Sequence, residues 1–448
     1  MPQHVVIAGG GFGGYYTART LERILPAEVP VTLVSDVNYM LYTPLLPGAA
    51  AGTLEPRHVV VPLRERLKHT ELRLGWVTGG DPSRRALRVE LAAGESVDFD
   101  YDQLVVALGS VSRAAPIPGL GDHAIGFKTI SEAISLRNRL VRHLEAAEAT
   151  DDVDLRRQYL NFVFVGGGYA GLEGAAELYD FATDVLIHYP RCRQTGMRWV
   201  LVDAAPRIMP EIQPELAGFT LRLLRRRGLE VMLETQVTRV TDAAVELSTG
   251  ETIPCRTVCW TAGVKASPVA ERLGLPLDRG RIVCDETMRV SGYENVWALG
   301  DIAAIPDPAR PGEACPPTAQ HAIRQGKLMA HNVAAALGHR PEIQPFRFKT
   351  LGAFADLGRQ NAVANLMGAR VRGFPAWAIA RFYHLAWIPG FKSKVRLIAD
   401  WTMDFWFPRD VAELGQLGHP PRLAEHVVPS QLRQHESGGA AVADSSAA

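Results

Sequence analysis

The sequence contains one strand-and-glycine motif twice, and this repeat constrains the fold more than any other feature. The run HVVIAGGGFGG occupies residues 4–14, and NFVFVGGGYAG occupies residues 161–171. In each copy a β-rich run precedes Gly-x-Gly-x-x-Gly, and a segment with helical spacing and a second apolar run follow. The expected helices are residues 16–25 and 172–181, and the expected second strands are residues 29–35 and 199–203. Because this order opens a βαβ dinucleotide-binding unit, we expect two such units.

The first glycine motif has the composition that a dinucleotide pyrophosphate requires. Gly9, Gly11 and Gly14 supply the tight turn, the close approach of backbone to pyrophosphate and the close helix–strand contact. The start of the following helix presents unpaired N–H groups to the phosphates. At the end of the second strand either Ser35 or Asp36 could bond a ribose hydroxyl, and the sequence leaves this contact open.

The second glycine motif carries a clue to the nucleotide. Gly166, Gly168 and Gly171 repeat the pattern, and Asp203 ends the following strand. A carboxylate there accepts hydrogen bonds from both ribose hydroxyls and repels a 2′-phosphate, which favours NADH over NADPH. The nearby Arg207 weakens this argument, because an arginine can accommodate a phosphate. A solvated strand end is the alternative for Asp203, since the intervening loop is longer than the usual spacing by about ten residues.

The composition excludes several classes of protein. The 448 residues include 48 basic and 48 acidic side chains, and this balance argues against nucleic-acid binding. An apolar content of 47% is too high for a mainly disordered chain. No window approaches 18 apolar residues without a charge, and no secretory signal precedes the first glycine motif. We therefore expect a soluble or peripheral protein in a reducing compartment, with no metal site.

Three further segments have a recognisable pattern. Residues 81–104 and 230–252 alternate polar and apolar side chains as small antiparallel strands do, and residues 130–149 have the spacing of an amphipathic helix. Residues 370–409 carry seven basic and two acidic side chains together with four of the eight tryptophans. Interleaved aromatic and basic residues suit a lipid headgroup boundary, where the cations meet anionic lipid. A dimer interface or an ordinary aromatic core is the alternative.

Six more runs give the chain a family resemblance. With the two glycine motifs, YDQLVVALGS at 101–110 and NVWALGD at 295–301 resemble the two-dinucleotide-binding flavoprotein reductases. Narrower features resemble the type II NADH:quinone oxidoreductases, the non-pumping NADH dehydrogenases. These features are NYMLYTPLL at 38–46, PTAQHAIRQG at 317–326, GFPAW at 373–377 and GFKSK at 390–394. The resemblance covers about residues 4–415.

The resemblance implies an FAD-dependent enzyme that passes electrons from NADH through the flavin to a membrane quinone without pumping ions. The first motif would hold FAD and the second NADH, with Asp301 bonded to the ribityl chain of the flavin. Gln320 and the backbone of Ala319 would lie near the flavin ring and the quinone, with a helix-start cap as the alternative role of Gln320. Glu173 is expected near the nicotinamide with a part in proton delivery. Glu177, four residues later on the same helix face, is expected to be a solvated acid.

Further cofactor contacts are expected in the same two domains. They are Gly13, Thr43, Pro44, Val77, Ala107, Gly109, Gly263 and Gly300.

The cysteines argue against thiol relay chemistry. The five of them include no Cys-x4-Cys or Cys-x2-Cys pair, and Cys255 and Cys259 are separated by three residues on an expected buried strand. Sulfide:quinone oxidoreductases share the fold but need cysteines beside the flavin, and Cys192 and Cys315 lack that context. Two alternatives remain. The chain could be a reductase for a soluble acceptor such as a ferredoxin, or a slow-turnover NADH-sensing flavoprotein.

These observations predict an α/β fold with two Rossmann-like domains and a C-terminal membrane-associating helical segment. The expected divisions are an FAD domain at 1–118 and 262–345, an NADH domain at 119–261, a membrane-anchoring and dimerisation region at 346–430, and a disordered tail at 431–448. We expect a homodimer bound peripherally to the cytoplasmic face of the inner membrane. Its partners would be a membrane quinone and the lipid bilayer surface, and no nucleic acid. The sequence does not identify the quinone.

Overall fold

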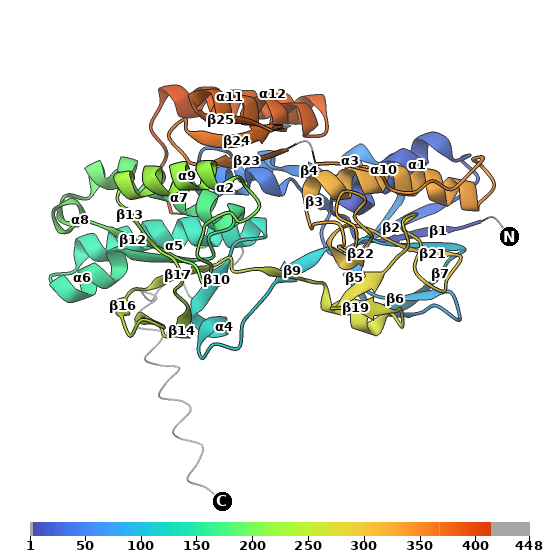
Figure 1. Ribbon diagram of the computed structural model, residues 1–448, viewed down its shortest axis with the longest axis horizontal. Coiled ribbons are helices and arrows are strands. Elements are labelled where there is room, and N and C mark those ends of the chain that lie inside the picture. Colours follow the sequence, from blue (N-terminus) through green and yellow to red (C-terminus); the bar gives the residue numbers. More distant parts are fainter. Residues whose placement is uncertain (1–2, 351, 367, 414–448) are drawn as a thin grey trace, which may run out of the picture. The chain divides into compact units, whose positions relative to one another are not determined.

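The first glycine motif lies at the centre of a seven-stranded sheet. The computed structural model describes residues 3–350, 352–366 and 368–413 (Figure 1), so the expected tail at 431–448 lies outside the described residues. The strand order is β21-β8-β1-β2-β5-β6-β7, in which β21 to β5 run parallel and β5, β6 and β7 form an antiparallel meander. The strands are β1 (Val5–Ala8), β2 (Val31–Ser35), β5 (Glu71–Asp81), β6 (Ala86–Leu91), β7 (Ser96–Asp100), β8 (Gln103–Val106) and β21 (Val296–Ala298). Because β21 comes from far along the chain, the sheet is assembled from two separate segments.

Helix α1 (Phe12–Ile24) begins four residues earlier than its expected start at residue 16. Gly11 is its N-cap residue, so the helix starts inside the glycine motif and the first turn contains Gly13 and Gly14. Helix α10 (Ala319–Ala336) lies beside α1 over the same sheet (Figure 1). The helix that carries the Ala-Gln-His-Ala run is thereby held against the first glycine motif.

The second glycine motif lies in a five-stranded parallel sheet with the order β10-β17-β11-β12-β13. Its strands are β10 (Ala124–Gly126), β11 (Asn161–Val165), β12 (Arg198–Val202), β13 (Leu229–Met232) and β17 (Thr257–Trp260), and its helices are α5 (Ile130–Ala149), α6 (Val153–Leu160), α7 (Tyr169–Val185), α8 (Pro190–Thr195) and α9 (Pro214–Arg227). Helix α5 has the bounds expected from its periodicity. It starts at a capping box, in which the Thr129 hydroxyl accepts from the Glu132 N–H and the Glu132 carboxylate accepts from the Thr129 N–H.

Short elements connect these two sheets or lie at their edges. The expected strands within residues 230–252 are present, because β14, β15 and β16 form an antiparallel sheet. The short elements are β3 (Tyr39–Leu41), α2 (Leu46–Ala50), β4 (Val60–Pro62), α3 (Leu63–Arg66), β9 (Ser110–Ser112), α4 (Leu120–His123), β14 (Val237–Val240), β15 (Ala244–Leu247), β16 (Thr252–Pro254), β18 (Val264–Ala266), β19 (Leu277–Asp278), β20 (Arg281–Val283) and β22 (Ala303–Ala304).

The C-terminal segment, residues 352–409, packs against helices of the second sheet. An antiparallel sheet of β23 (Gly352–Asp356), β24 (Ala362–Leu366) and β25 (Ala369–Gly373) precedes α11 (Phe374–Trp387) and α12 (Phe391–Trp406). These elements lie together at the top of Figure 1, and β23 packs against α7. No helix in the described part of the chain is long and apolar enough to cross a membrane.

Most basic side chains of residues 370–409 contact groups of the protein. Five of the seven do so, through partners within the segment and through partners in distant parts of the chain. Arg370 pairs with Glu215, Arg372 covers the Phe219 ring, Arg381 lies between Trp377 and Trp401, Lys394 donates to the Ala386 carbonyl, and Arg409 pairs with Glu177 and Asp404.

Candidate functional site

A cavity connects the carboxyl ends of the parallel strands of both large sheets. Its volume is ≈ 2570 Å³. Drug-sized ligands occupy pockets of roughly 300–1,000 Å³, so this cavity has room for more than one such molecule. Its walls come from both glycine motifs, β9, the start of α10, β23 and α11.

The site residues expected from the sequence line this cavity, with two exceptions. Gly14 and Gly171 are not among the lining residues. A Cβ atom on Gly14 would overlap the carbonyl oxygen of Gly9, and one on Gly171 would overlap that of Gly166. These two glycines therefore bring each helix against its strand, which is the role of the third glycine in this motif.

The first glycine turn has the form of a pyrophosphate cradle. Gly9 has φ +110°, and a side chain there would meet the Ala107 backbone. The Cβ position of Gly11, at the N-cap of α1, has no atom within 4 Å, so space is open where the helix presents its unpaired N–H groups. Asp36 is exposed and lines the cavity, whereas the Ser35 hydroxyl is buried against Gly10. This glycine turn and Asp36 therefore fit the pyrophosphate and a ribose of FAD.

The second glycine turn repeats this geometry with an acid beside it. Gly166 has φ +114°, and the Cβ position of Gly168, the N-cap of α7, is again open. The Asp203 carboxylate accepts hydrogen bonds from the N–H groups of Gly167 and Ala205 and lines the cavity. The Arg207 guanidinium donates to the Pro210 carbonyl at 2.5 Å and is not a lining residue. The phosphate-binding alternative for Arg207 therefore loses its geometric basis.

Asp301 belongs to a polar cluster that the sequence did not predict. The Ser110 hydroxyl donates to the Asp301 carboxylate at 2.5 Å, and the Lys128 ammonium donates to that hydroxyl at 2.5 Å. The Lys128 nitrogen is 4.0 Å from the carboxylate, and burial lowers the pKa of Lys128. Lys128 follows β10 of the second sheet, so one ion pair joins the two Rossmann-like parts across the cavity. No local sequence signal identifies this lysine.

Gln320 is held by the C-terminal sheet, and it does not cap its helix. The hydroxyl of Thr318 caps α10 by accepting from the His321 N–H. The Gln320 amide nitrogen donates to the Gly352 carbonyl at 2.9 Å. Its amide oxygen is buried and has no hydrogen-bond partner within the described residues. The start of α10 and the start of β23 are thus joined at the cavity wall.

Glu173 and Glu177 lie on the face of α7 that the C-terminal segment covers. The Glu173 carboxylate accepts from the Asp356 N–H at 2.9 Å, and burial raises its pKa well above the usual range, with the nearby Asp356 and Glu177 charges adding to the effect. Burial also raises the pKa of Asp356, to about 7.

The expectation that Glu177 is a solvated acid is wrong. Its side chain is only 5% exposed, and the Arg409 guanidinium lies 3.5 Å from its carboxylate. The Thr53 hydroxyl donates to the same carboxylate at 3.4 Å. Helical spacing alone does not reveal this burial, because both partners come from distant parts of the chain.

The end of the cavity near α11 is aromatic. The Tyr42 hydroxyl lies 3.3 Å from Nδ1 of His384, and both side chains line the cavity. The Phe354 ring, on β23, packs against the rings of Tyr383 at 4.8 Å and His384 at 6.2 Å, and Trp387 completes this wall. Sequence reasoning assigned none of these residues to the site, because aromatic residues at helical spacing also occur in ordinary cores.

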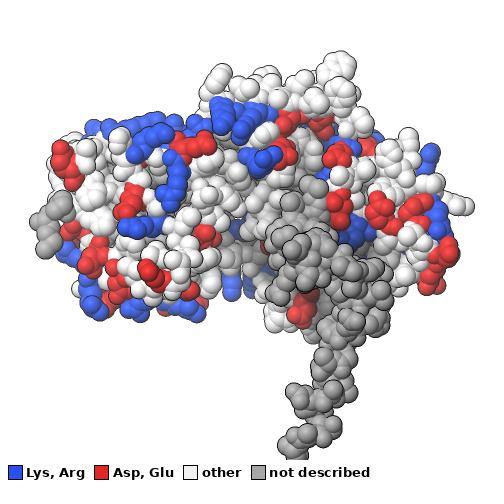
Figure 2. Space-filling view, turned by 180° about the vertical axis from the view of Figure 1, so that it is seen from behind, with Lys and Arg blue, Asp and Glu red and all other residues white. Residues whose placement is uncertain are grey.

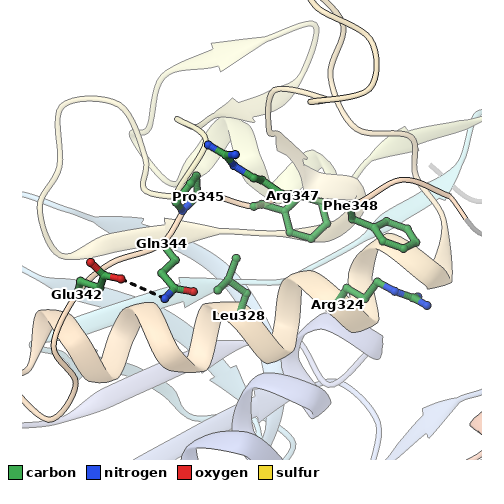
Figure 3. A pocket seen from close by; sticks show the side chains of 8 residues that line it. Arg324, Leu328, Glu342, Gln344, Pro345, Arg347 and Phe348 are labelled. Atoms are coloured by element: carbon green, nitrogen blue, oxygen red, sulfur yellow. Dashed lines mark hydrogen bonds between the residues drawn. The ribbon is translucent and has the colours of Figure 1, made fainter.

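A second hollow of ≈ 620 Å³ opens over α10 and shares Phe348 with the main cavity (Figure 3). The Arg324 guanidinium lies over the rings of Phe348 at 4.2 Å and Trp387 at 4.9 Å. This arginine therefore packs the loop after α10 against α11 and rigidifies the aromatic wall.

The thiols lie away from the cavity. All five cysteines are buried and free, and none is a lining residue. Burial raises the pKa of each, for example to about 12 for Cys192 and to about 11 for Cys315, so they remain protonated at neutral pH. Thiol relay chemistry has no group to perform it here. Within the described residues, no set of three or more His, Cys, Asp or Glu side chains could hold a metal ion.

Comparison with known proteins decides the family. A profile of the family described as "Pyridine nucleotide-disulphide oxidoreductase" matches residues 3–326. The chain is 33% identical over 416 residues to the type II NADH:quinone oxidoreductase Ndh of Mycobacterium tuberculosis, covering 90% of this chain and 88% of that protein. The chain belongs to the type II NADH:quinone oxidoreductases. Another relative is the demethylphylloquinone reductase NdbB of Synechocystis, which is 30% identical and of which 95% is covered, as is 89% of this chain.

Solved structures share the fold of this type II NADH:quinone oxidoreductase. The NDH2 of Plasmodium falciparum in complex with NADH has a TM-score of 0.84 at 18% identity, covering 92% of this chain and all of that chain. The sulfide:quinone oxidoreductase of Aquifex aeolicus has a TM-score of 0.65 at 19% identity, covering 90% of this chain and 95% of that chain.

Membership in the family confirms the central functional expectation. The cofactors are FAD and NADH, and the activity is electron transfer from NADH to a quinone. The sulfide:quinone, ferredoxin-reductase and NADH-sensor alternatives are set aside, since the Mycobacterium tuberculosis relative is named a type II NADH:quinone oxidoreductase and matches over 88% of its length.

Proposed function

We propose that the enzyme oxidises NADH at the second glycine turn and reduces a membrane quinone at the aromatic end of the cavity, with FAD between them. The observation that carries this proposal is the continuity of one cavity from both glycine turns to α11. FAD, when bound, supplies the electron relay between donor and acceptor. The protein supplies position, charge and the exclusion of water.

For FAD we propose contacts that start at the first glycine turn. Gly9, Gly11 and Gly13 would receive the pyrophosphate, and Asp36 would accept from the ribose hydroxyls because its carboxylate faces the cavity. Asp301 would hold the ribityl chain, with its charge compensated by Lys128. Further contacts would come from Thr43, Pro44, Val77, Ala107, Gly109, Gly300 and Ala319, all of which line the cavity.

For NADH we propose contacts at Gly166, Gly168, Asp203 and Gly263. The Asp203 carboxylate already accepts two backbone N–H groups, which fixes its orientation while a lone pair is left for a ribose hydroxyl. Glu173 would lie at the nicotinamide end, where burial raises the pKa of its carboxyl group well above the usual range.

For the quinone we propose a site beside Gln320. One N–H of its amide is bonded to the Gly352 carbonyl, and the second N–H is available to a quinone oxygen. That interaction strengthens as the oxygen gains charge during reduction, so it favours the transition state over the bound substrate.

We propose that α11 and α12 bind the membrane surface. Nine large apolar side chains between residues 374 and 407 are exposed, and the highest part of Figure 2 is formed mostly by uncharged side chains, with a group of basic ones just below it. They are Phe374, Phe382, Phe391, Val395, Ile398, Met403, Phe405, Trp406 and Phe407. Apolar contact, more than cation attraction, would drive binding, since most of the nearby cations engage the protein. A quinone would then reach the aromatic end of the cavity from the lipid, and a homodimer through this face is the competing use of it.

The remaining assignments follow from this arrangement. We propose the division into an FAD domain at 1–118 and 262–345, an NADH domain at 119–261 and a C-terminal region from 346, in agreement with the strands that each large sheet contains. We also propose that the enzyme is peripheral on the cytoplasmic face of the inner membrane, where NADH is present.

An anaerobic titration tests the function. The purified holoenzyme receives NADH without oxygen, and a short-chain quinone follows while the flavin absorption is recorded. We expect bleaching by NADH and rapid recovery with quinone. Bleaching without recovery would refute quinone as the acceptor, and bleaching by NADPH alone would refute the role of Asp203.

A further inference from the structure

The reduction of a quinone needs one proton more than NADH supplies. NADH delivers two electrons and one hydrogen nucleus, whereas a quinone becomes a quinol by taking two electrons and two protons. One proton per turnover must therefore come from water, through a group that reaches the quinone oxygen. Neither Gln320 nor a backbone amide can give up a proton for this purpose.

We propose that the hydroxyl of Tyr42 is this proton donor, and that Nδ1 of His384 positions it. This proposal rests on the proposed function, because it requires a quinone beside Gln320. Tyr42 is the catalytic residue, since its oxygen would touch the substrate, and His384 is a positioning residue that acts through Tyr42.

The first support is the continuity of one wall from Gln320 to Tyr42. Gln320 donates to Gly352 at the start of β23, and Phe354 on the same strand contacts His384. His384 in turn bonds the Tyr42 hydroxyl at 3.3 Å, with the two rings edge-on at 5.9 Å. Gln320 and Tyr42 both line the cavity, and we place one carbonyl oxygen of the quinone at each of these two groups.

The second support is the way in which both groups are held. The Tyr42 side chain is 2% exposed and its ring packs edge-on against Phe12 at 5.6 Å, so the hydroxyl has little freedom. Burial, together with the nearby Arg381 charge, lowers the pKa of His384 to about 4, and the imidazole is therefore neutral at pH 7. In the Nδ1–H tautomer it donates to the Tyr42 oxygen and turns the phenolic hydrogen toward the cavity.

The proton balance closes with water as the source. As electrons reach the quinone, its oxygen becomes basic, the Tyr42 O–H bond breaks and an O–H bond forms on the quinone oxygen. The Tyr42 oxygen keeps the electron pair and regains a proton from water after the quinol leaves. Burial raises the pKa of Tyr42, so the phenol is protonated at neutral pH before each turnover.

Tyr42→Phe tests the proposal, because it removes the hydroxyl and keeps the ring contact with Phe12. We expect the kcat for a short-chain quinone to fall by about 10²-fold, which is the usual contribution of a general acid. Flavin content, the rate of flavin bleaching by NADH and the reduction of ferricyanide, which accepts electrons without protons, should stay within about two-fold of the original enzyme. Binding of the quinone in the absence of NADH, measured by the quenching of tryptophan fluorescence, should also persist.

Three further variants distinguish a chemical role of the Tyr42 hydroxyl from a structural one. Tyr101→Phe is the matched control, because Tyr101 is a buried tyrosine whose hydroxyl has no partner within the described residues and which does not line the cavity. It should leave both acceptors unaffected. His384→Asn, whose amide N–H can take the place of Nδ1–H, should retain most of the quinone activity that His384→Phe loses.

The measured activities distinguish a proton donor at Tyr42 from a structural role of this residue. Undiminished quinone turnover in Tyr42→Phe overturns the proposal, and an equal loss with quinone and ferricyanide also overturns it by showing a structural role. If the unmodified enzyme reduces ferricyanide but no quinone, the proposed function itself fails and this proposal with it.

Discussion

At the scale of single residues, the glycines of each motif divide into two kinds. Gly14 and Gly171 have no space for a side chain, because the carbonyl oxygens of Gly9 and Gly166 occupy it. Gly11 and Gly168 have open space at the start of a helix. Gly14 and Gly171 therefore determine the fold, and Gly11 and Gly168 leave room for a ligand.

Gly168→Ala should therefore affect one nucleotide and not the fold. The new methyl group occupies the space at the α7 start where a pyrophosphate must approach closely, so we expect the KM for NADH to rise by at least about ten-fold. FAD content and the thermal midpoint should stay unchanged. Gly11→Ala is the matched variant and should lower FAD content instead. An unchanged KM in Gly168→Ala would contradict the NADH assignment.

At the scale of elements, ion pairs join α7 to the C-terminal segment. Glu177 of α7 pairs with Arg409, and Asp180, one turn later, pairs with Arg227 of α9 and with Arg359 of the loop between β23 and β24. Burial raises the pKa of Asp180 to about 6, so part of this network is near its titration range at neutral pH. Buried pairs of this kind determine which surfaces meet, because an unpaired charge there is costly.

Arg409→Ala should destabilise the enzyme strongly. It removes the guanidinium that pairs with the buried Glu177 carboxylate, and breaking a buried pair costs about 3–5 kcal/mol. Arg370→Ala is the control, because its pair with Glu215 is exposed and contributes about 0–1 kcal/mol. The free energies of unfolding of both holoenzymes in urea give the comparison. Equal losses in the two variants would show that Glu177 does not depend on Arg409.

At the scale of the whole molecule, the C-terminal segment has two different faces. Its inner face covers α7 and closes the aromatic end of the cavity, and its outer face presents exposed apolar rings. Membrane binding and quinone access are therefore coupled through the same two helices in our proposal.

The triple substitution of Phe382, Phe391 and Trp406 to serine should release the enzyme from membranes. These side chains are 72%, 81% and 72% exposed, so their loss removes apolar contact without disturbing the core. We expect vesicle binding to fall by at least about ten-fold while the turnover of a short-chain quinone persists. Ile187→Ser, at a 71% exposed position outside this segment, should bind vesicles normally. Retained vesicle binding with loss of a dimer in sedimentation would assign the face to self-association.

The sequence by itself determined the features that depend on local pattern. The repeated Gly-x-Gly-x-x-Gly predicted two Rossmann-like sheets because only glycine permits the turns at Gly9 and Gly166, and both φ values are positive as expected. Periodicity placed α5 at residues 130–149, the bounds that the structure has. The runs shared with a known family predicted the cofactors and the activity, and the comparison with relatives confirmed them.

Only the tertiary structure decided the features that depend on distant partners. The burial of Glu177 by Arg409, the bridge from Lys128 to Asp301 and the contact of Tyr42 with His384 each join residues far apart in the chain. A charged or aromatic side chain has the same local signature whether it faces solvent, lipid or a buried partner. Its role is set by the desolvation and pairing that the fold imposes, and no run of neighbouring residues encodes these.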